Sequence, residues 1–310
     1  GLNMRLKDAP RYPRNLALSR KKNSMIILQY AYEVARQCRL MGIHINFAPV
    51  LDVNSNPKNP VIGSRSFGSS VRVVSELGRM YSIGLETNGV LSVAKHFPGH
   101  GDTSEDSHKT LPTVSATKER MQEMELAPFR YYIENNLGGI MTAHLRVPAY
   151  DASGRPASLS PLITTELLRK EMDFDGLIFT DALEMKGAQA GGVPSVAVAA
   201  LQAGNDILLG PSDPTKALDE IMAALKSGAL TEASIEEKCR RVLAFKYALI
   251  IAKEDLGVAP EKVKDAIFTK EEAKLRAYLE ESAGAKNVAA DPTAKTPAMK
   301  SQSGRRKSTK

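Results

Sequence analysis

The stretch KHFPGHGDTSEDSHKT, residues 95–110, concentrates side chains that can transfer protons or bind a metal ion. It contains three of the five histidines of the chain and three acidic residues. Within it, Asp106 precedes His108 by two positions. A carboxylate at that spacing can accept a hydrogen bond from one imidazole nitrogen and raise the basicity of the other. The stretch therefore predicts a general acid/base at His108, with Asp106 as the residue that orients it.

A zinc site is the alternative interpretation of the same histidines. Enough nitrogen and oxygen ligands are present, namely His96, His100, His108, His144, Asp102 and Asp106. Their spacing differs from a short-range metal motif such as H-E-x-x-H on a helix. We therefore favour proton transfer, and predict neither a metal nor a cofactor. A purely structural role, in which the histidines bond to the backbone of a Pro-Gly turn, stays open for each of them taken singly.

A second chemical group occurs in the segment FTDALEM, where Asp181 directly follows an apolar run. A carboxylate held at the end of a buried strand can act as a nucleophile towards an electrophilic carbon. The same residue could instead cap the N-terminus of a following helix. The residue by itself does not decide between these two roles.

Five apolar runs rich in Val, Ile, Leu and Phe would position these groups, at 45–53, 90–97, 138–145, 176–183 and 205–211. Helical spacing of apolar residues occurs at 24–41, 71–87, 117–135, 161–172 and 215–226. Continuous apolar strands that alternate with helices are typical of a parallel sheet covered on both faces. The pattern predicts an α/β fold, as an open doubly wound sheet or a closed barrel.

The positions of the polar residues favour the barrel. Asp52, Lys95, His96, His144 and Asp181 all stand at or near the ends of these runs. The strand ends of an eight-stranded β/α barrel converge on one active site, whereas an open sheet concentrates its polar groups at one switch point. We therefore predict a (β/α)8 TIM-type barrel.

Only five of the eight strands of such a barrel are visible, so the first strands are expected to precede Gly1. The incomplete barrel would expose sheet edges and be unstable unless another chain fills the gap. We predict a partial barrel domain at 1–254, a helical extension at 255–285 and a disordered basic tail at 286–310.

The charge of the chain is concentrated in that tail. The net charge is +7, and residues 286–310 hold seven Lys or Arg against the single acid Asp291, which leaves about +1 for the rest. The folded body is therefore not predicted to bind nucleic acid. No apolar run approaches the roughly 20 residues that span a bilayer. Cys38 and Cys239 lie in amphipathic patterns and are expected to be buried free thiols.

Together these segments resemble glycoside hydrolase family 3, and more narrowly its β-N-acetylglucosaminidase branch. Six blocks occur in the order of that family between about Gly1 and Ile250, namely NFAPVLDV, VIGSRSFG, VAKHFPGHGDTSEDSH, IMTAHL, FTDALEM and AGNDILL. The family nucleophile is the aspartate of the TDALEM block, which implies Asp181. The acid/base of this branch is the histidine of a D-S-H triplet, which implies His108 with Asp106.

The resemblance also implies the residues that bind the sugar. The arginine of RSFG and the KH of KHFPG contact it in the family, which implies Arg65, Lys95 and His96. Arg5 resembles the arginine that closes the second-strand motif, whose opening aspartate would fall before Gly1. We add His144, at the end of the third run, to the expected substrate-binding residues.

The implied activity is that of a retaining exo-glycosidase that releases terminal β-linked N-acetylglucosamine from cell-wall or chitin-like sugars. A carbohydrate is the only partner it requires, and the oligomeric state is left open. A β-glucosidase-like relative and a metal-dependent hydrolase are the alternatives, and a histidine acid/base would also admit phosphate as the acceptor. Relatives occur in the bacterial cytoplasm and in the periplasm or exterior, so both compartments fit.

Overall fold

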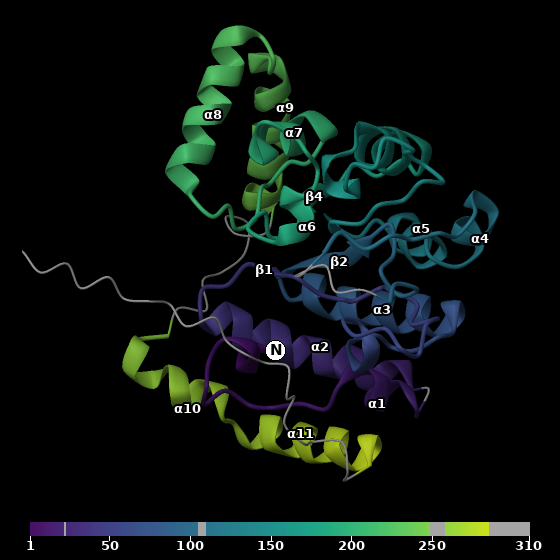
Figure 1. Ribbon diagram of the computed structural model, residues 1–310. Helices are drawn as coiled ribbons and strands as arrows, with labels where there is room; N and C mark the ends of the chain where they lie inside the picture. The colour runs from purple at the N-terminus through teal and green to yellow at the C-terminus, as the bar shows by residue number, and fades with distance from the viewer. Residues whose placement is uncertain (22, 105–109, 249–257, 285–310) are drawn as a thin grey trace, which may run out of the picture.

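The computed structural model describes residues 1–21, 23–104, 110–248 and 258–284. Its centre is a sheet of four parallel strands in the order β1-β2-β3-β4 (Figure 1). The strands are β1 (Ile45–Asn46), β2 (Leu91–Phe97), β3 (Gly139–Thr142) and β4 (Leu177–Thr180). The α/β class and the parallel sheet are therefore confirmed.

Both faces of this sheet are buried, and the side chains alternate between them. Leu91 and Val93 of β2, Met141 of β3 and Phe179 of β4 share one apolar cluster. Their neighbours along the strands, such as Ile140 and Ile178, belong to the larger core on the other face. Alternation along a strand explains this division. The continuous apolar runs of the sequence arise because both faces require apolar residues.

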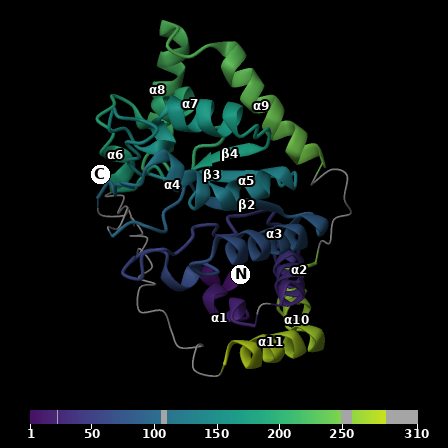
Figure 2. The ribbon, with the colours of Figure 1, turned by 90° about the vertical axis from the view of Figure 1, so that its right-hand side faces the viewer.

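Helices connect the strands. Several of them pack on the larger core, whereas one packs on the smaller cluster of the other face through Val242 and Phe245. These helices are α1 (Asn15–Ser19), α2 (Ser24–Leu40), α3 (Val71–Thr87), α4 (Lys118–Glu123), α5 (Ala127–Glu134), η4 (Leu162–Glu171), α6 (Lys186–Gln189), α7 (Val196–Ala203), α8 (Pro214–Ser227) and α9 (Glu232–Lys246). Helix α2 packs on α3, and α3 packs on α5 and β2 (Figure 2). At Gly84 of α3, an added Cβ would come within 2.5 Å of the Cβ of Ala31. Glycine therefore permits the close approach of α2 and α3.

Three predicted helices, at 24–41, 71–87 and 215–226, are confirmed as α2, α3 and α8. The single helix predicted at 117–135 is wrong, because the segment forms α4 and α5 with a break between them. Pro128 lies in the first turn of α5. Proline is tolerated there but would remove a hydrogen bond inside a continuous helix. The segment predicted at 161–172 is helical, but its bonding pattern is that of a π-helix.

All five apolar runs are longer than the strands they form, and the difference is greatest for the first and the last run. In the run 45–53 the strand β1 covers two residues, and Val50 forms one further bridge to Lys95. Pro49 interrupts this run, and proline has no N–H to donate to a sheet. The run 205–211 contributes a single parallel bridge, between Ile207 and Phe179.

The sheet remains open over the part of the chain that the structure describes, with β1 and β4 at its edges. These residues therefore form a parallel α/β sheet but not a closed eight-stranded barrel. The strands expected before Gly1 and the domain boundaries stay predictions. The tail predicted to be disordered, 286–310, lies outside the described residues.

The C-terminal helices lie beside the N-terminal part of the chain (Figures 1 and 2). Helix α10 (Val263–Ile267) packs on α2, and α11 (Lys270–Ala283) packs on α1 and α2. The Tyr12 hydroxyl donates to Oε1 of Glu272 at 3.1 Å, and Arg36 donates to the carbonyl of Ile267 at 3.0 Å. The segment predicted as a helical extension thus contains helices that belong to the main core.

The two cysteines differ in their surroundings. Cys38 is buried, as predicted. Cys239 is exposed, so that prediction is wrong. Its helix, α9, contains no buried residue, because it lies at the border of the described fold and is covered on part of one face only. None of the helices described has both the length and the apolar character needed to cross a membrane.

A buried ion-pair cluster joins β4 to η4 and α9. The side chain of Asp206 is 0% exposed, and its Oδ2 accepts from the N–H of Ile178 at 2.8 Å and from Arg169 at 2.9 Å. Arg241 of α9 donates to the other carboxylate oxygen. Asp206 therefore neutralises two arginines while it fixes the strand that leads to Asp181.

We expect Asp206→Ala to lower the free energy of unfolding by about 3 kcal/mol or more, because it leaves two arginines without their buried partner. Glu166→Ala is the matched control, since its pair with Lys170 on the same helix is 51% and 63% exposed. That change should cost about 0.5 kcal/mol or less. Urea unfolding of both variants measures the difference, and equal losses would contradict the role given to Asp206.

Candidate active site

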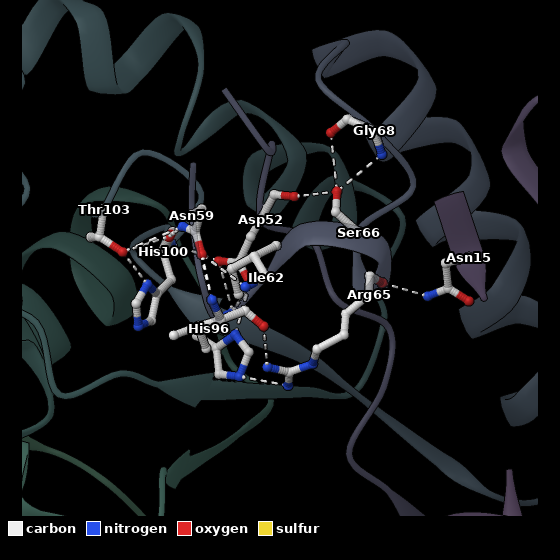
Figure 3. Close-up of polar contacts among 11 residues, drawn as sticks. Asn15, Asp52, Asn59, Ile62, Arg65, Ser66, Gly68, His96, His100 and Thr103 are labelled. Atoms are coloured by element: carbon white, nitrogen blue, oxygen red, sulfur yellow. Dashed lines mark hydrogen bonds and ion pairs between the residues drawn. The ribbon is translucent and has the colours of Figure 1, made fainter. Parts of the chain in front are cut away.

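The polar residues predicted at the run ends do gather at one edge of the sheet. Lys95 and His96 stand near the end of β2, His144 lies two residues beyond β3, and Asp181 directly follows β4. Asp52 reaches the same place from the run that begins with β1, and it hydrogen-bonds to His96 (Figure 3). The parallel arrangement explains this, because the carboxyl ends of parallel strands share one edge.

Asp52 is the centre of the hydrogen-bond network drawn in Figure 3. It is 0% exposed. Its carboxylate accepts from Nδ1 of His96 at 2.7 Å, from the backbone N–H of His96 at 3.2 Å and from the backbone N–H of His100 at 2.7 Å. Burial by itself would raise the pKa of Asp52, but the interactions with His96 and with the His100 N–H outweigh it and lower the pKa. Asp52 is therefore ionised.

The second ring nitrogen of His96 points to Arg65, with 3.4 Å between Nε2 and Nη2 (Figure 3). A guanidinium group can only donate, so Nε2 must accept and Nδ1 must carry the proton that goes to Asp52. His96 is then neutral, in agreement with burial, which lowers its pKa. Arg65 ends the short helix η2 (Gly63–Arg65), and Asn15 donates to its carbonyl at 2.8 Å.

Residues 98–104, which follow β2, are packed against the segment that follows Asp52. Asn59 donates to the carbonyl of His100 at 2.7 Å, and the Thr103 hydroxyl lies 2.6 Å from Nδ1 of His100. A Cβ at Gly101 would lie 1.8 Å from the carbonyl oxygen of Val53, so only glycine fits there. Asp106 and His108 come next in the chain, and both lie outside the described residues.

Lys95 is half-buried, and its ammonium group interacts electrostatically with the carboxylates of Asp181 and Asp52. Burial lowers its pKa to about 8, an effect that Arg65 and Arg5 reinforce and that Asp181 and Asp52 oppose. The peptide bond from Lys95 to His96 is cis. Lys95 therefore links Asp52 electrostatically to Asp181.

Asp181 is half-buried and held by backbone groups. Its own N–H donates to the carbonyl of Thr142 at 2.9 Å, and its Oδ1 accepts from the N–H of Ala182 at 2.8 Å. Burial would raise the pKa of Asp181, but His96, His144, the Ala182 N–H and Lys95 together lower it. At neutral pH the group is a carboxylate, which is the state that a nucleophile requires.

His144 is only 1% exposed, and both of its ring nitrogens face protein groups. Nδ1 lies 2.7 Å from the hydroxyl of Ser158, and Nε2 lies 3.0 Å from the carbonyl oxygen of Ala182. Arg5 lies farther out. It is exposed directly after the short helix η1 (Leu2–Met4), and no side-chain hydrogen bond joins it to the cluster over the described ranges.

The structure thus brings Arg65, Lys95, His96, His144 and Asp181 together, with Arg5 nearby but exposed. In the described ranges, which omit 105–109, no group of three or more His, Cys, Asp and Glu side chains is arranged to hold a metal ion. Both ring nitrogens of His96 and of His144, and Nδ1 of His100, lie within hydrogen-bond distance of protein groups.

Asp52 was not predicted to have a specific role in the site, although it stands at the end of an apolar run. A carboxylate directly after the buried segment FAPVL was the available signal. Asn59, Thr103 and Ser158 were missed altogether. They contact histidines through the folded chain, and no spacing in the sequence indicates such contacts.

The sequence of the chain is similar to a known family model and to known proteins. The family model described as "Glycosyl hydrolase family 3 N terminal domain" matches residues 1–245. The chain is 35% identical over 276 residues to the Beta-hexosaminidase A of Pseudoalteromonas piscicida, which covers 82% of this chain and 46% of that protein. It is 38% identical over 225 residues to the Beta-hexosaminidase of Methylococcus capsulatus, with 71% and 66% covered. The chain thus spans about half to two thirds of the length of these relatives.

A solved structure shares the fold. The glycoside hydrolase family 3 beta-N-acetylglucosaminidase from Paenibacillus sp. str. FPU-7 superposes with a TM-score of 0.83 at 38% sequence identity. The superposition covers 89% of this chain and 53% of the Paenibacillus chain. The open parallel sheet therefore corresponds to part of a larger protein of known structure.

The buried His100 should make the free energy of unfolding depend on pH. Burial lowers the pKa of His100 from 6.5 to about 4, so between these values the unfolded chain binds a proton that the folded chain does not. The contribution is complete above about pH 6.5 and is lost as the pH falls towards 4. It amounts to roughly 3 kcal/mol at most.

We expect His100→Asn, which keeps a polar group near Nδ1 but cannot titrate in this range, to show a smaller rise in unfolding free energy between pH 4 and 6.5. Urea unfolding at several pH values measures the slope. His44→Asn, at a histidine outside the cluster, is the control. An unchanged slope in His100→Asn would contradict a neutral buried His100.

Proposed function

The chain belongs to glycoside hydrolase family 3, and we propose that it carries the catalytic residues of a retaining exo-glycosidase for terminal β-linked N-acetylglucosamine in cell-wall or chitin-like sugars. The observation that carries the proposal is Asp181, an ionised, half-buried carboxylate at the carboxyl edge of the sheet. The names of the relatives support N-acetylglucosamine as the sugar that is released. They are beta-hexosaminidases and a beta-N-acetylglucosaminidase.

In this proposal Asp181 is the nucleophile. Its lowered pKa keeps it ionised, and the Ala182 N–H engages Oδ1, which leaves Oδ2 as the oxygen to attack the anomeric carbon. The attack forms a covalent glycosyl-enzyme, which water then hydrolyses with overall retention of configuration. Lys95 adds positive charge near the carboxylate and stabilises its ionised form.

Arg65, Lys95 and His96 are the proposed sugar contacts. Arg65 and Lys95 are charged donors, and such donors bind sugar hydroxyls with geometric specificity. His96 is held in one tautomer between Asp52 and Arg65, so its ring is fixed before substrate arrives. Such fixed groups lower the entropy lost on binding. Arg5, exposed near Lys95, is proposed as an outer contact.

His108, oriented by Asp106, is the proposed acid/base. It first protonates the glycosidic oxygen of the leaving group and then deprotonates the attacking water. The usual template for this reaction uses two carboxyl groups. A neutral imidazole in place of one of them avoids charge repulsion with Asp181. The chemistry requires no metal ion and no cofactor.

Nitrophenol release from the N-acetyl-β-glucosaminide and the β-glucoside tests the proposal. We expect activity on the N-acetyl substrate and little on the glucoside. Asp181→Asn should reduce kcat roughly 10⁴-fold or more, because the amide cannot act as the nucleophile that forms the covalent intermediate. Asp175→Asn, at an exposed aspartate six residues upstream, is the matched control and should retain activity.

Three outcomes would contradict this reading. A folded protein that releases nitrophenol from neither sugar would contradict the glycosidase function. Preference for the β-glucoside would favour the β-glucosidase-like alternative. Loss of activity with a chelator would favour the metal-dependent alternative.

The leaving group tests His108 separately. Glycosides with a good leaving group need little protonation, so His108→Ala should cost far less on a dinitrophenyl than on an alkyl glycoside. Added azide, which attacks without a general base, should restore turnover of the glycosyl-enzyme. The measurement is kcat/KM across leaving groups of different pKa. Equal losses on all substrates would argue against His108 as the acid.

A further inference from the structure

We propose that Ser158 is a positioning residue that fixes the tautomer of His144, and that His144 in turn holds the segment bearing Asp181. Ser158 belongs to none of the sequence blocks that indicated the family, and over the described ranges no hydrogen bond joins it to Arg65, Lys95 or His96. The inference deepens the proposed function, since it takes Asp181 as the nucleophile.

The tautomer of His144 follows from its two partners. Nε2 lies 3.0 Å from the carbonyl oxygen of Ala182, which can only accept, so Nε2 carries a proton. Nδ1 lies 2.7 Å from the hydroxyl of Ser158. In the neutral ring Nδ1 accepts, so the Ser158 hydroxyl donates. If the proton moved to Nδ1, the lone pair of Nε2 would face the lone pairs of the carbonyl.

The backbone around Ser158 is anchored on the segment that follows β3 and carries His144. The N–H of Ser158 donates to the carbonyl of Ala143 at 3.0 Å, and Asn205 donates to the carbonyl of Ser158 at 2.8 Å. Asn205 also accepts from the Thr142 hydroxyl at 2.7 Å. Because Ser158 and Asn205 are fully buried, water does not substitute for these bonds. The hydroxyl of Ser158 is therefore held in a fixed place beside the ring.

Ala182 connects His144 to Asp181 through hydrogen bonds. The carbonyl of Ala182 accepts from His144, and the N–H of the same peptide group, on Leu183, donates to the carbonyl of Leu209 at 2.8 Å. The N–H of Ala182 donates to the Asp181 carboxylate at 2.8 Å. The peptide after Ala182 is thus fixed at both ends, and the preceding N–H is aimed at the carboxylate.

This arrangement separates His144 from the residues that would touch the sugar. Both ring nitrogens face protein groups, so in this proposal His144 acts through Asp181 in place of the direct substrate contact expected from the sequence. A catalytic group must be held close to its productive geometry by neighbours whose own positions are locked. Loss of the Ser158 hydroxyl would leave Nδ1 without its donor and allow the ring to change tautomer or orientation.

Nitrogen-15 spectra of histidine-labelled protein test the first step without turnover. The spectrum of His144→Gln identifies the His144 signals. We expect a single neutral tautomer with the proton on Nε2, retained in Ser158→Thr, and altered signals in Ser158→Ala. Ser160→Ala is the matched control, because its buried hydroxyl contacts Asp151 instead, at 2.5 Å. That variant should leave the His144 signals unchanged. Wild-type signals in Ser158→Ala would overturn the proposal.

Kinetics test the second step. We expect Ser158→Ala to lower kcat by about 10-fold to 100-fold with little change in KM, and Ser158→Thr to keep most of the activity. A merely structural role would lower the unfolding temperature of Ser158→Ala while kcat of the folded enzyme stayed unchanged, which would overturn the proposal. If the wild type hydrolyses neither sugar, the proposed function fails, and the nitrogen-15 signals still decide the role of Ser158.

Discussion

The site depends on one buried negative charge, that of Asp52. An ionised carboxylate inside a protein is tolerated only when hydrogen bonds replace the water it has lost. Asp52 obtains them from the ring of His96 and from the backbone of residues 96 and 100. Each bond also fixes the donor. The ring of His96 faces Arg65, and the backbone at His100, which follows β2, is held beside Asp52. The solvation of one carboxylate thus determines the shape of half the site.

The remaining half is ordered by neutral groups. Thr142, Asn205, Ser158, His144 and Ala182 form a continuous series of hydrogen-bonded residues that ends beside Asp181. Neutral partners suit this position, because a second buried carboxylate would oppose the ionised state of Asp181. The positive charge that Asp181 needs comes from the other half, through Lys95. The two halves therefore supply different things, charge from the ends of β1 and β2 and fixed geometry from the ends of β3 and β4.

Part of the fold and of the site could be predicted from the helical spacing of apolar residues and from the polar residues at the ends of apolar runs. Helices α2, α3 and α8 follow directly from helical spacing, and Lys95, His96, His144 and Asp181 follow from their places after apolar runs. The helix break near Pro128 and the short β1 before Pro49 depend on single residues that override a pattern. Ser158 and His144 are fourteen positions apart, and Asp52 and His96 forty-four. Contacts of that kind are created by the packing of strands, so no local pattern indicates them.

The position of Asp181 suits the role proposed for it. In the proposed mechanism Asp181 forms a bond to the sugar, and a misplacement of about 1 Å can cost such a reaction about 10²-fold. It stands directly after a strand whose neighbours hold it by backbone hydrogen bonds. A proton moves along a hydrogen bond whose donor needs only to come within reach of the glycosidic oxygen and later of water. In the sequence His108 follows the anchored residues His100 and Thr103. The sheet therefore carries the proposed nucleophile, which is the group with the stricter positional demand.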